Sequence, residues 1–441
     1  MPPQAIPADT LIDARWIIPV EPPGVVLAGH SVVVRDGAIC DVLPTTEAHA
    51  RYAAPDRVTL PEHVLIPGLI NLHTHAAMTL MRGVRDDVSL MEWLNRYIWP
   101  AEMKLASPEL VRDGTLLACA EMMRGGVTCF NDMYFFPEAA GAAALQAGMR
   151  VALGIIVVEF PSPYASDPSD YLAKGLAMRD AFRDEPLLSF CMAPHAPYSV
   201  SDASFERIAT YAAELDLPVH LHLHETIDEI HESLKEHQER PIARMRRLGL
   251  LGPGLIAVHA VHLDPAEADL LAQEGCHVAH CPASNLKLAS GIAPVAAMRR
   301  AGVNIGLGTD SAASNNSLDM FSETRLAALL AKGNSSDPTA LPAQAALEMA
   351  TLNAARALGL QDRIGSLLPG KRADIVAVDF GALELTPCYD PMSHLVYAAG
   401  REHVTHVWID GKLRVENRQL TGLDTAELKA KARYWRERIQ S

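Results

Sequence analysis

Several features are missing from this sequence of 441 residues, and each absence removes a class of function. Basic runs are absent and the formal net charge is −15, so the surface is expected to repel a nucleic-acid polymer. No apolar run approaches the length that spans a bilayer. The first residues, MPPQAIPADTLIDARW, lack the basic and apolar regions of a signal peptide. We therefore expect a soluble, cytoplasmic protein with a small neutral molecule as its partner, and neither nucleic acid nor membrane.

Closely spaced cysteine pairs are also absent, because no CxxC string occurs. An odd number of scattered cysteines is typical of free thiols in a reducing compartment. The seven are Cys40, Cys119, Cys129, Cys191, Cys276, Cys281 and Cys388.

The two ends of the chain have the same character, with short β-rich runs joined by turns. Near the start, SVVVRDGAICDVLP contains an Asp36-Gly37 hairpin signal, and near the end HVTHVWIDGKLRVENRQL repeats it at Asp410-Gly411. Because chain ends often lie close together, both ends are predicted to form one composite β-sandwich domain from residues 1–66 and 369–441. The last residues, TAELKAKARYWRERIQ, predict a charged helix.

The middle of the chain, residues 67–368, alternates short apolar runs with longer amphipathic ones. Eight β-then-α units and a hydrophobic content of 49% predict an α/β protein, with a (β/α)8 TIM-like barrel as this domain. The segment 342–360 is expected to be the helix that follows the eighth strand. The eight candidate strands are PGLINLHTH, GVTCFNDM, MRVALGIIVV, LLSFCMAPHA, PVHLHLHE, LIAVHAVHL, HVAHCPAS and NIGLGTDS.

Metal ligands and proton carriers gather at the ends of these strands, which share one mouth in such a barrel. Each of these strand-end sequences alone is also compatible with a histidine in the core or an aspartate that caps a helix. Their occurrence together at the same end of the barrel strands indicates a metal site. Strand alternation does not separate His222 from its neighbours. The residues concerned are His73 and His75, then His220, His222, His224 and Glu225, then His259 and His262, and finally Asp310.

The chain resembles the amidohydrolase superfamily, and within it the 5′-methylthioadenosine/S-adenosylhomocysteine deaminases. The resemblance spans nearly the whole chain, and two of its strings, HTHAAMTLMRG and GTDSAASNNS, are specific. It rests also on HLHLHET, CPASNLKLASGIAPV and GSLLPGKRADIV. It implies metal-dependent hydrolysis of an adenosine-type nucleoside to its inosine analogue and ammonia.

The resemblance also assigns roles. It implies one divalent metal ion per subunit, with zinc the first candidate and iron or manganese open, held by His73, His75, His222 and Asp310. Catalytic roles fall to Glu225 as proton carrier, His259 as the residue that orients the water or alkoxide, and Asp310 as proton acceptor. The resemblance assigns substrate binding to Glu102, which would contact the ribose, and to His195, together with Glu225 and Asp310.

Other residues near the site have a simpler interpretation. We expect hydrogen bonds that support the metal site from His220, His224 and His262. Two locations, the wall of a substrate pocket or the hydrophobic core, remain open for the side chains of Met78, Met81, Trp93 and Trp99.

One departure from the family bears on the substrate. Some members carry arginines on and after the third strand that hold the far end of the substrate, whereas VALGIIVVEFPSPYAS has none. Arg150, just before this strand, is interpreted as structural. Because arginine is the natural partner of a carboxylate, we expect 5′-methylthioadenosine or adenosine to be handled better than S-adenosylhomocysteine.

Other functions remain open at this point. A related deaminase or chlorohydrolase could act on guanine, a pterin or an s-triazine, and the barrel could also be a non-catalytic scaffold. A binuclear hydrolase needs a modified lysine where this chain has His195. A homo-oligomer is left open.

Overall fold

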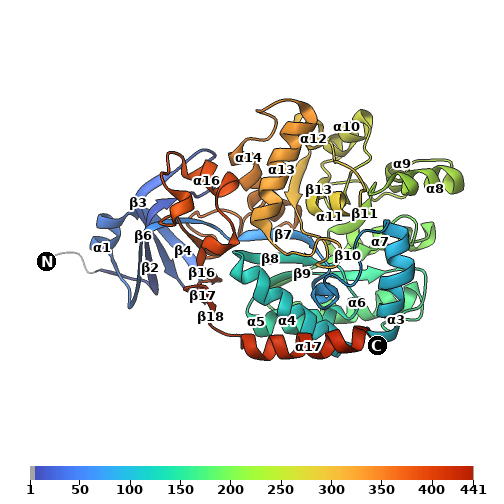
Figure 1. Cartoon of the computed structure of the whole chain (residues 1–441), viewed down its shortest axis with the longest axis horizontal. Helices are drawn as coiled ribbons and strands as arrows, with labels where there is room; N and C mark the ends of the chain where they lie inside the picture. The colour runs from blue at the N-terminus through green and yellow to red at the C-terminus, as the bar shows by residue number, and fades with distance from the viewer. Residues whose placement is uncertain (1–4, 441) are drawn as a thin grey trace.

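The computed structural model describes residues 5–440, and Figure 1 shows a β-sheet body beside a larger helix-covered barrel. The eight predicted strands all form, and they pair in parallel with neighbours in chain order. The predicted barrel is therefore confirmed. Its strands are β7 (Leu69–Thr74), β8 (Val127–Asp132), β9 (Arg150–Val157), β10 (Leu188–Pro194), β11 (Val219–Leu223), β12 (Leu255–His259), β13 (His277–His280) and β14 (Asn304–Leu307).

The first and last strands meet at a seam that side chains help to close. The Asn71 Oδ1 accepts from the Thr309 amide (2.9 Å), and the His73 carbonyl accepts from the Asp310 amide (3.0 Å). Gly308 permits this approach, because a Cβ there would lie 2.8 Å from the His73 nitrogen. The seam therefore sets Asp310 directly beside His73.

Helices cover the outside of the barrel between the strands. Most begin at a proline in the first turn, where no amide hydrogen bond is lost. They are α4 (Pro108–Arg124), α5 (Pro137–Ala147), α6 (Pro168–Phe182), α7 (Asp202–Leu215), α8 (Ile227–His237), α9 (Pro241–Arg247), α10 (Pro265–Gln273), α11 (Pro282–Lys287), α12 (Val295–Ala301) and α13 (Met320–Ser335). Before α4, the chain over the mouth contains η1 (Ala76–Met81), α2 (Leu90–Trp93), η2 (Leu94–Ile98) and α3 (Trp99–Leu105).

The prediction for residues 342–360 was wrong in two respects. Helix α13 comes first after the eighth strand, and the segment itself splits into α14 (Ala343–Met349) and α15 (Leu352–Ala357). The break falls at Thr351, whose backbone is not helical (φ −136°, ψ −95°). It leaves the Ala350 carbonyl free to accept from the Ile70 amide (2.8 Å), which anchors the start of β7.

Strands from both ends of the chain form one eight-stranded sheet, as predicted. One buried cluster joins side chains of both halves, including Ile12, Val32, Ile375 and Trp408, so the sheet folds over a shared core as a sandwich does. Its order is β18 (Gln419–Leu420), β17 (Lys412–Glu416), β16 (Val404–Ile409), β15 (Ile375–Asp379), β6 (Asp56–Pro67), β2 (Thr10–Ile17), β3 (Leu27–Arg35) and β4 (Ala38–Pro44). Beside it lie α1 (Thr45–Arg51) and the short pair β1 (Ile6–Pro7) and β5 (Tyr52–Ala53); η3 (Leu383–Leu385), α16 (Pro391–Tyr397) and η4 (Arg401–His403) lie between β15 and β16 in the chain.

Both predicted Asp-Gly hairpins occur in this sheet. Asp36 and Gly37 have φ of 53° and 73°, and Asp410 and Gly411 have φ of 54° and 74°. Positive φ at both central residues defines the type I′ turn that matches the strand twist.

Two contacts tie the ends of the chain to the barrel. The predicted terminal helix, α17 (Thr425–Gln440), runs along the barrel below α4 and α5 in Figure 1, and its Trp435 and Lys431 donate to the Asp113 carboxylate (3.0 and 2.8 Å). Arg150 on β9 is 2% exposed and forms a two-point ion pair with Asp374 (3.2 Å each), which confirms its structural interpretation.

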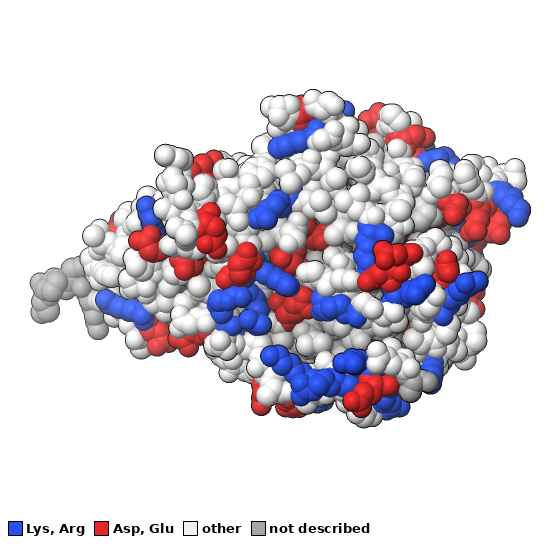
Figure 2. Space-filling model, in the orientation of Figure 1, with Lys and Arg blue, Asp and Glu red and all other residues white. Residues whose placement is uncertain are grey.

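The distribution of surface charge and the state of the cysteines can be compared with the expectations from the sequence. On the face that Figure 2 shows, lysine and arginine lie among aspartate and glutamate instead of forming one continuous basic surface. All seven cysteines are unpaired. Among residues 5–440, no helix combines the length and the apolar character needed to cross a bilayer.

Candidate active site

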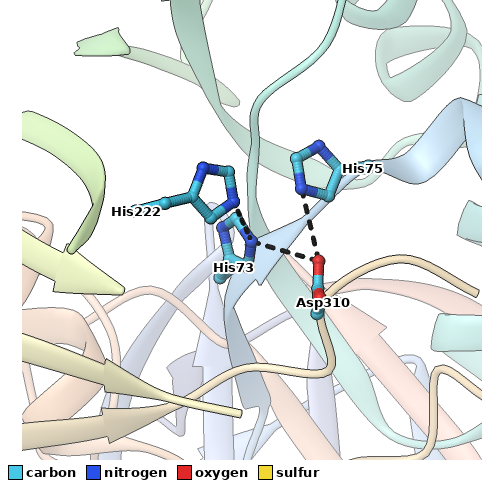
Figure 3. A group of neighbouring side chains, drawn as sticks. All are labelled: His73, His75, His222 and Asp310. Atoms are coloured by element: carbon cyan, nitrogen blue, oxygen red, sulfur yellow. Dashed lines mark hydrogen bonds and ion pairs between the residues drawn. The ribbon is translucent and has the colours of Figure 1, made fainter. Parts of the chain in front are cut away.

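Four side chains from three strand ends converge at the mouth of the barrel (Figure 3). His73 and His75 come from β7 and its C-terminal end, His222 from β11, and Asp310 from the loop after β14. The Nε2 atoms of His73 and His75 each lie 3.2 Å from Asp310 Oδ1, and the Nε2 atoms of His222 and His73 lie 3.1 Å apart. One ligand atom from each of the four lies within 4.8 Å of the others. The structure thus brings together all four residues that the resemblance implies.

The hydrogen bonds behind the rings show that this donor set fits a divalent cation. His75 Nδ1 donates to the Met133 carbonyl (2.6 Å), and His222 Nδ1 donates to the His195 carbonyl (2.7 Å). Because a carbonyl oxygen only accepts, both neutral rings present a lone pair at Nε2. The nitrogen lone pairs and the carboxylate oxygen all face one point, and none of these atoms carries a proton that it could donate to the others. A cation bound between them would satisfy all of these acceptors.

Asp310 is oriented by groups that the resemblance did not assign. Its Oδ2 accepts from the hydroxyls of Ser284 (2.6 Å) and Ser314 (2.8 Å), which leaves Oδ1 toward the histidines. Burial would raise the pKa of Asp310, but the close approach of the His73 and His75 rings outweighs burial and holds the pKa well below the usual value. The group is therefore a carboxylate at neutral pH.

The two expected proton-handling residues lie next to this cluster. Glu225 is 5% exposed and follows β11, and its pKa is raised because burial disfavours the charged form. His259, at the end of β12, has its Nε2 3.8 Å from a Glu225 oxygen and hydrogen-bonds Asn285 through Nδ1 (2.8 Å). Its ring stacks on His222 at 5.5 Å, so both residues face the same space.

The histidines left in supporting roles do support the site. His220 Nε2 hydrogen-bonds His73 Nδ1 (2.9 Å), and His262 Nε2 bonds the Ser290 carbonyl (2.8 Å). His224 lies beyond the end of β11 with φ +57°, and its Nε2 accepts from the Ile242 amide (3.1 Å). The left-handed turn takes His224 out of the strand alternation, which is why the sequence alone could not separate it from His222.

A pocket opens beside the four ligands and contains the expected substrate residues. Glu102 on α3 is 7% exposed, and burial raises its pKa to about 7. His195, after β10, donates through Nδ1 to Ser199 (2.9 Å). Burial, followed by the neighbouring His75 and His73 rings, lowers the pKa of His195 to about 3. Away from the metal ligands and the proton-handling residues the wall is mainly apolar and aromatic, and no lysine or arginine belongs to the described lining. It is lined by His75, Met78, Leu90, Trp93, Leu94, Ile98, Trp99, Glu102, Met133, Tyr134, Phe135, Ile156, Val158, Phe160, His195, Tyr198, His222, Glu225, His259, Leu288, Asp310 and Ser311.

Of the four apolar residues left open between pocket and core, Met78, Trp93 and Trp99 line the pocket. Met81 is fully buried in the main core and is not part of the described lining.

Sequence reasoning missed several residues that hold the site. The Glu229 carboxylate accepts from the amides of His224 (2.9 Å) and Glu225 (2.8 Å) and so fixes the backbone of Glu225. A signal existed, because Thr226 and Glu229 have the spacing of a helix capping box. Ser284 and Ser314 belong to the strings CPASNLK and GTDSAASNNS, but nothing in a single sequence says which serine faces Asp310.

The fold and the site define a hydrolase of the amidohydrolase class. The profile of the amidohydrolase family matches residues 64–414, which cover both β7 and the whole ligand set. A triazine hydrolase variant shares the fold at 23% identity (TM-score 0.89, covering 97% of this chain and 99% of that one).

Comparison with curated proteins narrows the class. The chain is 47% identical to the 5-methylthioadenosine/S-adenosylhomocysteine deaminase of Saccharophagus degradans, over 99% of this chain and 98% of that protein. It is 48% identical to the protein of the same name from Teredinibacter turnerae, over 98% of each. A crystal structure described as an adenosine deaminase from Xanthomonas campestris with bound zinc is 51% identical (TM-score 0.98, 99% of this chain and 100% of that one).

The chain therefore belongs to the 5-methylthioadenosine/S-adenosylhomocysteine deaminase family. It is an enzyme that hydrolyses carbon–nitrogen bonds and uses a divalent metal.

Proposed function

We propose that this enzyme hydrolytically deaminates the adenine ring of an adenosine-type nucleoside, with one zinc ion per subunit held by His73, His75, His222 and Asp310. The observation that carries the proposal is the convergence of three Nε2 atoms and one carboxylate oxygen beside a buried, protonatable Glu225. Relatives over the whole chain that are named as deaminases, and a zinc-bound neighbour, support it.

The bound divalent ion would supply Lewis acidity that makes water a nucleophile at neutral pH. Glu225, whose pKa burial raises, gives a proton to the ring nitrogen beside the reacting carbon. It then takes one proton of the attacking water and passes it to the amino group, which leaves as ammonia, and the other water proton, held by Asp310, finally restores Glu225. Asp310, an ionised carboxylate, accepts a proton from the attacking water. His259, fixed by Asn285, stabilises charge that grows on the oxygen. The products are the inosine analogue and ammonia.

The pocket favours a nucleoside with an uncharged 5′ substituent. Glu102 accepts hydrogen bonds from the ribose hydroxyls, and His195 contacts the nucleoside. Trp93, Trp99 and Phe160 offer apolar surface to a methylthio group. Because the described lining offers no arginine or lysine to the carboxylate of an amino-acid tail, 5′-methylthioadenosine and adenosine are preferred to S-adenosylhomocysteine.

We further propose the division of the chain into the barrel, 67–368, and the composite sandwich, 1–66 with 369–441. The free thiols suit the cytoplasm, where they would stay reduced. The small-molecule nucleoside is the only partner that we propose.

The test uses the full chain, stripped of metal and reloaded with zinc, iron or manganese in turn. Deamination of 5′-methylthioadenosine, adenosine and S-adenosylhomocysteine is followed by the ultraviolet change of the base. We expect zinc to restore turnover, with the specificity constant lowest for S-adenosylhomocysteine. Turnover of guanine or an s-triazine in place of the nucleosides would reject the proposed activity, and a clear preference for S-adenosylhomocysteine would reject the proposed specificity.

A further inference from the structure

Tyr134 carries a buried hydroxyl that approaches the Glu102 carboxylate without forming a hydrogen bond of ordinary geometry. The residue is 5% exposed and lines the pocket, and no group among the described residues meets its hydroxyl at hydrogen-bond distance and angle. Burying a hydroxyl without a partner destabilises a protein. An unpartnered hydroxyl in a substrate pocket therefore points to a polar group of the ligand.

The backbone on the N-terminal side of Tyr134 is pinned to the metal-ligand strand. The Met133 amide donates to the Thr74 carbonyl (3.0 Å), and the Met133 carbonyl accepts from His75 Nδ1 (2.6 Å). The ring of Phe135 packs against that of Tyr134 at 5.5 Å. These contacts fix the hydroxyl relative to the four ligands.

Glu102 faces Tyr134 with the complementary chemistry. Burial, then the negative charge of Glu102 and the approach of the phenol to that carboxylate, raise the pKa of Tyr134 well above its usual value, so the phenol keeps its proton and can donate. An ionised Glu102 only accepts. A sugar hydroxyl that donates its hydrogen to Glu102 still has lone pairs on its oxygen, and those can accept from the phenol.

We propose that Tyr134 is a specificity-determining residue whose hydroxyl donates a hydrogen bond to one ribose hydroxyl oxygen of the substrate, opposite Glu102. This inference rests on the proposed function and names a sugar contact that the resemblance did not assign. It makes the enzyme selective for ribonucleosides, because a deoxy sugar leaves both buried groups without their shared partner.

The experiment compares zinc-loaded full-length wild type and Tyr134→Phe on adenosine, 2′-deoxyadenosine and 3′-deoxyadenosine. We expect kcat/KM for adenosine to fall about tenfold, the size of one hydrogen bond. The same loss in kcat/KM is expected for the deoxy analogue that keeps the contacted hydroxyl. No loss is expected for the deoxy analogue that lacks this hydroxyl. Because the hydroxyl makes no hydrogen bond of ordinary geometry in the protein, Tm without substrate should not fall.

Tyr164→Phe is the matched control. Tyr164 is 4% exposed and its hydroxyl is also unpartnered, but it does not belong to the described pocket lining. We expect its kcat/KM values to stay unchanged.

An equal loss on all three nucleosides, no loss on adenosine, or a fall in Tm for Tyr134→Phe would overturn the inference. Failure of the proposed function is distinguishable, because wild type would then deaminate none of the three.

Discussion

Buried charges are arranged in opposite ways at the barrel mouth and at the junction with the terminal sheet. At the junction, Arg150 meets Asp374 through two bonds of 3.2 Å, and Asp410 lies 3.5 Å from the same guanidinium. At the mouth, Glu102 and Glu225 are buried without an arginine or lysine, and their pKa values are raised as a result. The junction satisfies its charges within the protein, which favours stability, whereas the mouth leaves its charged and polar groups for a ligand, which favours function.

The backbone shows the same contrast. At the mouth, four residues other than glycine have left-handed conformations at or shortly after their strand ends: His224 (φ 57°), His259 (φ 73°), Ala260 (φ 48°) and Asp310 (φ 61°). In the terminal sheet, positive φ at Asp36 and Asp410 belongs to ordinary type I′ turns. Strain that a turn does not require is typical of functional sites.

The largest effect is expected from removing a metal ligand. His222→Ala should lose both bound metal and turnover, because a buried cation site with one ligand fewer holds its ion weakly. Metal content by elemental analysis and kcat are the measurements. Since the mouth is not built for stability, the apo variant should unfold at a Tm no lower than that of apo wild type. Full metal content, or full turnover after stringent chelation, would contradict the assignment.

The next effect separates chemistry from metal binding at the same mouth. Glu225→Gln should keep the metal but lower kcat by about 10²–10⁴-fold, because the amide cannot carry the proton. Glu236→Gln on the exposed side of α8 is the control and should be unchanged. Near-normal kcat in Glu225→Gln would remove Glu225 from its role.

The junction is tested by Arg150→Met, with the reverse outcome expected. Leaving Asp374 buried and unpaired should lower the free energy of unfolding by about 3–5 kcal/mol, while kcat/KM of the folded enzyme stays the same. Arg15→Met breaks an exposed pair with Glu62, whose side chains are 47% and 55% exposed, and should cost at most about 1 kcal/mol. Denaturant titration measures both. Equal losses in the two variants would remove the distinction between the regions.

A smaller effect is expected from pH at the mouth. The pKa of Glu102 is raised from 4.5 to about 7, so the free enzyme holds that proton in a range where an exposed glutamate has lost it. As pH rises through about 7, Glu102 becomes an acceptor for both ribose hydroxyls, and KM for adenosine should fall. Glu102→Gln should flatten this limb of the KM profile, whereas an unchanged limb would assign it to another group.

The sequence predicted the strands and their order because each is a short apolar run between helical segments. It also located the candidate ligands, because HxH strings and an aspartate after a glycine-rich strand end are rare at one structural level, whereas the choice of His222 among its neighbours came from the resemblance. It could not place Glu229 or Ser284, whose roles depend on which backbone amide or carboxylate oxygen lies opposite them. The break at Thr351 was missed because helical periodicity continues across it, whereas the bond from Ile70 to Ala350 that forms there joins residues far apart in the sequence.

The composite sheet has a consequence for how the chain folds as it is synthesised. β6 pairs with β2 early, but its other neighbour, β15, leaves the ribosome only after roughly 300 further residues, a delay of tens of seconds at ordinary translation rates. Until then, one edge of β6 carries unpaired amides and carbonyls that could pair with another chain. The nascent protein thus depends on its last hundred residues to protect its first hundred from aggregation.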